Sequence, residues 1–398
     1  MPQPDHMRLA AGVGIVLVTS PARVHPSTEL LWAALGSTTL LRGLGEAPIS
    51  IVCDGYRTPD EIEDPQRSAK LEARLRRDPC SLSKRGIVSS GVGAAYEEYK
   101  RRLASEVAAR GLRERISIAT LDSHHGFALC VRHGLALCAD RGDRFALVLQ
   151  HDRAFIRRLE AADLEAVLGR LERDESCKYV GFASGTSKLI STQLQPRYKL
   201  GRLLEARARP LRAGLRLVPT VFWWDSNHLV HVARARRLLF EPFAHAPAAL
   251  RARAGALTLR RADFIEDRFG VEQKAILTVC TAFVSRLRHL ACTPPAPRLN
   301  LTSVSSGVLQ ALHAAPRAEL LEAFDFFGSF LLEESEVPAA EAAEATRAMG
   351  QDDDAAGPET VCELVDRHGR YTHVAHMDAR GAKPRSWLRE LPKLTEAG

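Results

Sequence analysis

Polar side chains that could hold a metal ion and a phosphate group stand directly after an apolar segment. The run Arg144–Phe155 (RFALVLQHDRAF) places Gln150, His151 and Asp152 after five apolar residues, and the basic Arg153 follows them. A carboxylate at the end of a strand can hold a divalent cation against a phosphate. We therefore expect a buried strand that delivers Asp152 to an exposed edge of a sheet.

Two adjacent acids lie later in the chain. The segment Asp263–Gly270 (DFIEDRFG) carries Glu266 and Asp267. A positioned carboxylate can take up a proton from a reacting group. Acids are also common at the beginning of a helix, where the helix dipole stabilises them. From the residues alone, both interpretations stay open.

An aromatic segment separates these two motifs. Val221–His228 (VFWWDSNH) contains Trp223 and Trp224, followed by Asp225. Indole rings can stack on sugars and an acid can hydrogen-bond to them, but paired Trp residues are as typical of a hydrophobic core. On a strand, only one of the two rings could face a site.

Alternating strands and helices must position these side chains. Apolar runs predict strands at Gly14–Thr19, Pro48–Cys53, Arg115–Ala119 and Phe145–Leu149. Helical spacing predicts helices from Ser27 or Thr28 to about Leu44, at Ala94–Gly111 and at His125–Ala139. This β-α-β-α-β-α-β order implies a parallel sheet with right-handed crossovers. Ligands bind beyond the carboxyl ends of such strands, a rule that points to Thr19, Asp54 and Gln150–Asp152.

The rest of the chain is less regular. Further expected elements are an irregular or helical excursion at Arg57–Lys84, a helix at Leu164–Glu175, strands at Tyr179–Ala183 and Tyr371–Met377, a β-rich region at Leu215–His231 and a helix at Val271–Leu290. The predicted domains are a catalytic domain at 12–292, a helical extension at 293–332, an acidic disordered segment at 333–359 and a C-terminal strand and tail at 360–398.

Composition narrows the function classes. The 398 residues carry a net charge of +7, which suits an anionic ligand, but no dense basic stripe with interleaved aromatics predicts nucleic-acid binding. The eight cysteines show no CxxC pair, and no stretch reaches the length of a membrane span. Phosphate-loop, HExxH and GxSxG motifs are missing, and no glycine-rich loop follows the first strand.

Two neighbouring segments resemble a known family. Gly126–Gly134, followed by Asp143–Asp152, is similar to a stretch of GT-A glycosyltransferases of the family 2 type, where a glycine-led helix with an Arg-Asn pair precedes a strand ending in a DxD motif. The first two predicted strands also look like the nucleotide-binding half of that fold. The resemblance covers roughly residues 12–290. Gln150 replaces the first Asp of the motif, giving a QHD variant, and His133 stands where Asn is usual.

The resemblance implies a nucleotide-sugar site. Thr19, Ser20, Asp54 and His151 would contact the nucleotide sugar, and Gln150 would hydrogen-bond the ribose without adding charge. Arg132 would pair with the diphosphate.

The resemblance also implies a metal site, a base and an acceptor site. Asp152 would bind a divalent cation, Mn²⁺ or Mg²⁺, and His376 would return to it from a late strand. Asp267 would remove the acceptor proton in an inverting enzyme, with Glu266 as the reserve. Trp223, Trp224 and Asp225 would contact the acceptor.

The implied fold is α/β, a Rossmann-like GT-A sheet that is mostly parallel, flanked by helices, with a smaller C-terminal appendage. The implied function is a glycosyltransferase that moves a sugar from a UDP- or GDP-sugar to a hydroxyl acceptor, in the cytoplasm or associated with the Golgi. A catalytically inactive relative that binds nucleotide or glycan remains an alternative, because Gln150 weakens the metal motif. A nucleotidyltransferase is a further alternative.

Overall fold

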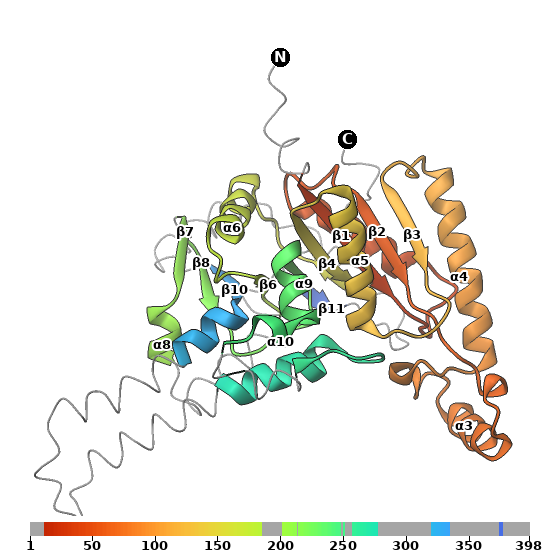
Figure 1. The fold of residues 1–398 in the computed structure, drawn as a ribbon. Helices are drawn as coiled ribbons and strands as arrows, with labels where there is room; N and C mark the ends of the chain where they lie inside the picture. The colour runs from red at the N-terminus through yellow and green to blue at the C-terminus, as the bar shows by residue number, and fades with distance from the viewer. Residues whose placement is uncertain are drawn as a thin grey trace, which may run out of the picture.

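A nine-stranded sheet forms the centre of the molecule, shown in a computed structural model (Figure 1). The described residues are 12–184, 201–212, 214–247, 250, 257–277, 320–334 and 374–376. The strand order is β3-β2-β1-β4-β9-β6-β10-β8-β7. Within these ranges, every helix is too short or too polar to span a lipid bilayer.

Most strands of this sheet run in one direction. The strands are β1 (Val13–Thr19), β2 (Ile49–Cys53), β3 (Ile116–Thr120), β4 (Phe145–Gln150), β6 (Tyr179–Phe182), β7 (Arg209–Arg212), β8 (Leu215–Pro219), β9 (His228–His231) and β10 (Ser329–Glu334). β9 is antiparallel to β4 and β6, and β8 is antiparallel to β10 and β7. The other pairings are parallel, so seven of the nine described strands point the same way.

Helices cover both faces of the sheet (Figure 1). They include α2 (Glu29–Ser37), α3 (Pro65–Arg77), α4 (Ser90–Ala109), α5 (Phe127–Arg141), α6 (Ala161–Arg173), α8 (Gly201–Ala206), α9 (Val232–Phe240) and α10 (Pro242–His245). Residues of α2, α4 and α6 belong to one hydrophobic core, and residues of α5 and α9 belong to the other. The predicted class, a mostly parallel α/β sheet flanked by helices, is confirmed.

The continuous apolar sequence of β1 is explained by these two cores. Ile15 and Leu17 belong to the core that includes α2, whereas Val16 and Val18 belong to the core that includes α5. Alternate side chains of a strand point to opposite faces, so a strand covered on both sides must be apolar throughout.

The prediction of one strand over Arg144–Phe155 is wrong. Here β4 ends at Gln150, a turn occupies His151 and Asp152, and β5 (Arg153–Phe155) begins a separate two-stranded sheet with β11 (Val374–His376). The backbone amide of Phe155 donates to Ser37 Oγ (2.9 Å), which ties β5 to the end of α2. Asp152 is therefore displayed by a turn between two strands.

The helix expected from Ser27 or Thr28 to about Leu44 is shorter than predicted. α2 ends at Ser37 and continues as a 3₁₀ turn over Thr38–Leu40. Ser37 Oγ donates to the carbonyl of Ala34 at 2.7 Å, and the hydroxyls of the next two residues bond in the same way. Hydroxyls that occupy helix carbonyls compete with the α-helical ladder, which accounts for the tightened end.

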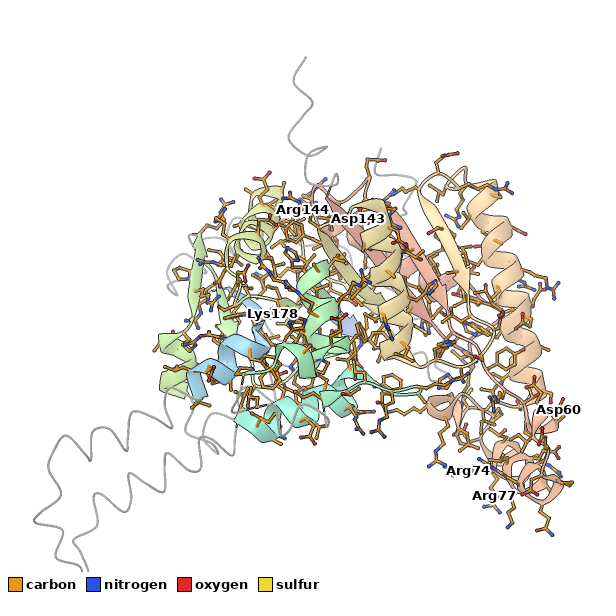
Figure 2. All side chains as sticks on the ribbon, viewed as in Figure 1. Asp60, Arg74, Arg77, Asp143, Arg144 and Lys178 are labelled. Atoms are coloured by element: carbon orange, nitrogen blue, oxygen red, sulfur yellow. The ribbon has the colours of Figure 1, made fainter. Side chains whose placement is uncertain are left out.

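The excursion at Arg57–Lys84 contains a regular helix, α3. Asp64 caps it by accepting from the backbone amides of Gln66 (2.9 Å) and Arg67 (3.2 Å). Figures 1 and 2 show α3 at one corner of the molecule, where it carries the labelled Arg74 and Arg77.

The sheet reaches beyond the expected domain boundary at residue 292. A helix at 320–327 leads into β10, which lies between β6 and β8 inside the sheet. Only Glu333 and Glu334 of the segment expected to be disordered are described, and both belong to β10. The predicted helix Val271–Leu290 is described as far as residue 277, and its remainder lies outside the described residues, as does most of 360–398.

Candidate functional site

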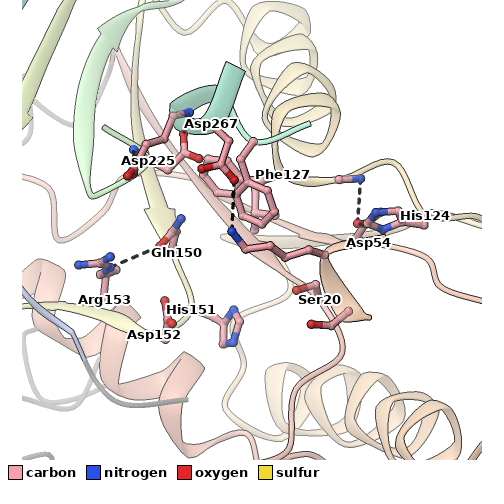
Figure 3. A pocket seen from close by; sticks show the side chains of 16 residues that line it. Ser20, Asp54, His124, Phe127, Gln150, His151, Asp152, Arg153, Asp225 and Asp267 are labelled. Carbon is pink, nitrogen blue, oxygen red and sulfur yellow. Dashed lines mark hydrogen bonds and ion pairs between the residues drawn. The ribbon is translucent and has the colours of Figure 1, made fainter. Parts of the chain in front are cut away.

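A cavity of about 340 Å³ lies at the carboxyl ends of β1, β2 and β4 (Figure 3). Its wall contains Ser20 after β1, Asp54 after β2 and the Gln150–Asp152 turn after β4. The parallel-strand rule pointed to Asp54 and to Gln150–Asp152; after β1 it pointed to Thr19, whereas the lining contains the next residue, Ser20. Adjacent parallel strands end at one edge of a sheet, and this brings together residues that are distant in sequence.

The rest of the lining comes from three other parts of the chain. Lys84 lies in a 3₁₀ turn (Ser83–Arg85), His124 lies in the loop before α5, Phe127 is the first residue of α5, and Glu266 and Asp267 begin a π-helical turn (Glu266–Gly270). The structure therefore brings the expected acid pair into the same cavity as the QHD turn (Figure 3).

The QHD turn is fixed to the loop that precedes β9. Arg153 Nε donates to Gln150 Oε1 at 3.4 Å, and Asn227 Nδ2 donates to the carbonyl of Arg153 at 3.3 Å. In the β5–β11 pairing, the backbone of His376 lies opposite Arg153, one residue beyond Asp152. The late strand predicted at Tyr371–Met377 thus runs next to the expected metal motif.

Asp54 is bound on both carboxylate oxygens. Oδ1 accepts the backbone amide of His125 (2.7 Å), while Oδ2 accepts that of Gly126 (3.0 Å) and lies 2.8 Å from His124 Nδ1. The side chain is only 2% exposed. Burial acts to raise the pKa of Asp54, but these hydrogen bonds outweigh it and the pKa is lowered. Asp54 thus anchors the chain where it enters α5.

Glu266 and Asp225 form a reciprocal pair. The backbone amide of Asp225 donates to Glu266 Oε2 (3.3 Å), and the backbone amide of Glu266 donates to Asp225 Oδ1 (3.1 Å). Burial raises the pKa of both carboxyls, and the nearby charge of Glu266 raises that of Asp225 further. Both side chains line the cavity.

Asp267 is more exposed than Glu266 and forms a salt bridge with a lysine. Lys84 Nζ lies 3.2 Å from Asp267 Oδ2, and the two side chains are 68% and 60% exposed. Lys84 Nζ also lies 5.0 Å from the centre of the Phe264 ring. This salt bridge joins the 3₁₀ turn at Ser83–Arg85 to the π-helical turn at Glu266–Gly270, and both turns contribute to the cavity lining.

Four expected site residues whose side chains the structure describes lie outside the cavity lining. Thr19 is buried at the end of β1, and Trp223 and Trp224 are buried in the core, where Trp223 packs on Tyr179 with ring centres 4.3 Å apart. Arg132 lines a separate surface hollow on α5, and its guanidinium lies 5.6 Å from the Phe240 ring centre. Neither indole ring offers an open stacking face, since both are almost fully buried.

Three charged or ionisable cavity residues were not foreseen as site residues: Lys84, His124 and Arg153. Arg153 adjoins the QHD motif, so its place in the sequence was a usable signal. His124 directly precedes the helix predicted from His125, but its contact with Asp54 spans many residues. Lys84 lies in the segment expected to be irregular or helical, where no periodic pattern indicates which way a side chain points.

The described residues do not form a metal site on their own. They contain no group of three or more His, Cys, Asp or Glu side chains arranged as metal ligands. Asp152 still offers one carboxylate to the cavity. Mg²⁺ in proteins often takes one or two carboxylates and completes its shell with substrate phosphates and water. The donor set therefore fits a cation that arrives with a diphosphate, and it does not form a cage of its own.

Comparisons with known proteins give distant likenesses only. No protein-family model matches the chain, and no curated protein matches it. Mouse xyloside xylosyltransferase 1, in its apo form, aligns with 67% of this chain and 83% of its own at 8% identity and a TM-score of 0.30. Residues 1–349 of S. aureus TarS align with 86% of this chain and 93% of their own at 10% identity and a TM-score of 0.27. At such values, neither likeness carries a functional assignment.

Proposed function

We propose that this protein is a glycosyltransferase that moves a sugar from a nucleoside-diphosphate sugar to a hydroxyl group of an acceptor. The observation that carries the proposal is that the QHD turn and the Glu266–Asp267 pair line the same cavity. Sugar transfer needs these two functions side by side, a binding edge for the diphosphate and a carboxylate that takes the acceptor proton.

On this proposal, the strand-end wall binds the donor. Ser20, Gln150 and His151 offer hydrogen bonds to the nucleotide sugar, and Asp54 holds the loop that forms one side of the cavity. Lys84 and Arg153 supply positive charge near the diphosphate, whose negative charge grows as it leaves.

A divalent cation, Mn²⁺ or Mg²⁺, is proposed to bind with the donor at Asp152, with His376 as a second ligand from β11. When bound, it would add positive charge beside the leaving diphosphate. The support is the position of Asp152 in the cavity wall and the register of β11, whose His376 backbone lies opposite Arg153.

Donor binding can be tested by thermal shift with UDP, GDP and their sugars, with and without Mn²⁺. We expect one nucleotide class to raise Tm, and we expect Mn²⁺ to enlarge the shift. Asp152→Ala should abolish the Mn²⁺-dependent part, while Asp140→Ala, an exposed acid on α5, should leave it unchanged. No stabilisation by any nucleotide would overturn the proposal.

The inactive alternative has a distinct outcome. Gln150 in place of an acid favours it, because the turn then offers one carboxylate where a DxD motif offers two. Nucleotide stabilisation without release of UDP or GDP, in the presence of Mn²⁺ and a panel of glycan acceptors, would support a binding protein over an enzyme.

A further inference from the structure

Behind Glu266 lies a second acid, Asp225, in an unusual position for a carboxyl group. Its side chain is 4% exposed, yet it borders the cavity. Oδ1 accepts the backbone amide of Glu266, whereas Oδ2 is buried and meets no hydrogen-bond partner in the described part of the chain. A buried, ionised carboxylate with one bare oxygen is costly, because nothing replaces the water that it loses.

The charges around Asp225 are mainly negative. Glu266 and Asp267 approach from the π-helical turn, and Arg153 is the cation that acts on it from β5. From β6, the hydroxyl of Tyr179 donates to the carbonyl of Trp224 and adds no positive charge. The salt bridge from Lys84 goes to Asp267.

Two neighbouring carboxyls in a buried place resist double ionisation, because each charge raises the free energy of the other. The deeper one therefore keeps its proton, and the one with better access to solvent ionises. Asp225 is the deeper group, and Glu266 is partly exposed at the cavity wall. The reciprocal amide bonds at 3.1 and 3.3 Å hold the two groups in this arrangement.

We propose that Asp225 is a positioning residue that stays in its neutral acid form and holds Glu266 as the carboxylate that accepts the acceptor proton. The part that concerns Glu266 rests on the proposed glycosyl transfer. In that step the acceptor oxygen bonds to the anomeric carbon, the bond from that carbon to the diphosphate oxygen breaks, and the diphosphate leaves with the electron pair. The acceptor proton moves to Glu266, and Asp267 stays paired with Lys84.

The protonation of Asp225 can be tested without any substrate. A buried carboxyl with a raised pKa makes the folded protein bind more protons than the unfolded chain, so stability falls as pH rises above about 3.9 and until the folded pKa is passed. Asn cannot titrate and keeps the Oδ1 acceptor. Asp225→Asn should therefore match wild type in Tm near pH 4 and exceed it increasingly towards pH 7.5.

The matched control for this titration is Asp267→Asn, at an exposed site on the same turn. It should show no gain in Tm that grows with pH. An Asp225→Asn variant that is less stable than wild type at pH 7.5, with a deficit that shrinks on acidification, would mean that Asp225 is ionised. That result would overturn the proposal.

The role of Glu266 is tested by transfer kinetics with the donor that the thermal-shift screen identifies. Asp225→Asn should keep kcat within about threefold and leave the acidic limb of the pH profile in place. Asp225→Ala should lower kcat at least tenfold, and Glu266→Gln should lower it about 100-fold or more, in the range of general-base losses. Asp267→Asn should lower kcat less than Glu266→Gln does.

The stability titration and the transfer kinetics can fail independently of each other. If no donor is turned over, the proposed function fails, and the stability titration still decides the state of Asp225. If transfer occurs but Asp225→Asn moves the acidic limb to lower pH, the removed group was a charge that raised the pKa of Glu266, and the positioning role is wrong. Greater loss in Asp267→Asn than in Glu266→Gln would make Asp267 the base.

Discussion

Asp54 and Asp225 are both almost fully buried beside one cavity, but their surroundings move their pKa values in opposite directions. Asp54 receives two backbone amides and the ring of His124, whereas Asp225 receives one amide and faces the charge of Glu266. Donors stabilise the ionised form, and burial beside a like charge destabilises it. The residue type alone therefore does not determine the charge that an acid brings to this site.

The lowered pKa of Asp54 predicts a pH-dependent contribution to stability. The contribution is present above the unfolded pKa, near 3.9, and is lost as pH falls through the lower folded pKa. Asp54→Asn should lower the free energy of unfolding at pH 7 by about 1–3 kcal/mol, since an amide cannot accept all three hydrogen bonds.

Urea unfolding between pH 3 and 7 measures this effect. The deficit of Asp54→Asn should shrink at the acidic end, where the wild-type carboxyl takes up a proton. Asp122→Asn, an exposed acid on the nearby loop, should match wild type throughout. A deficit that is constant with pH would show that shape, and not charge, accounts for the loss.

The sequence predicted the positions of some residues of this site, but it did not predict their contacts. Asp152 and Asp54 were found because each follows an apolar strand, and parallel strands end at one edge. The pairing of Asp54 with His124 depends on how the loop before α5 folds back, which no spacing encodes. The burial of Trp223 and Trp224 depends on tertiary packing, and the sequence left both interpretations open.

Among the elements, the turn into α5 contains a glycine that has both a positive φ and a close backbone neighbour. Gly126 has φ of 80°, and a Cβ there would lie 2.6 Å from Ala262 Cα. The backbone amide of Ala262 donates to the carbonyl of His125 at 2.8 Å, so the two segments are held in contact. This close approach connects the Asp54 wall to the chain that leads to Glu266.

Gly126→Ala should therefore destabilise the protein by two effects, backbone strain and a clash. Gly142, at the other end of α5, is the matched control, because its φ is 84° but no atom lies within 4 Å of its Cβ position. Gly142→Ala should cost about 1 kcal/mol from strain alone. We expect Gly126→Ala to cost at least about 2 kcal/mol more in denaturant unfolding, and equal losses would contradict the close contact.

The elements that the sequence predicted well are those specified locally. β1, β2 and β4 are short apolar runs, and α4 and α5 have helical spacing over many residues. The antiparallel insertion of β9 between β4 and β6 was not predicted, since its place depends on partners distant in the chain. The turn at His151–Asp152 was missed because no Gly or Pro marks it and apolar residues resume at Ala154 and Phe155 in β5.

At the scale of the whole molecule, β10 makes the two ends of the described chain interdependent. Leu332 of β10 and Leu17 of β1 are both fully buried in the same hydrophobic core. Each change to Ala should lower the free energy of unfolding by about 2–5 kcal/mol in a single cooperative transition. If Leu332→Ala cost less than about 0.5 kcal/mol, 320–334 would be a dispensable appendage.

The place of β10 also matters while the protein is being made. Strands β1 to β4 leave the ribosome first and can pair with one another at once. β6 and β8 follow, but β10, which lies between them in the sheet, is synthesised much later. Until Ser329–Glu334 leaves the exit tunnel, β6 has an open edge, and open strand edges attract other chains. The nascent chain can therefore mispair at β6 and β8, which lie in the half of the sheet that does not form the cavity. A chaperone would be most useful before β10 emerges from the ribosome.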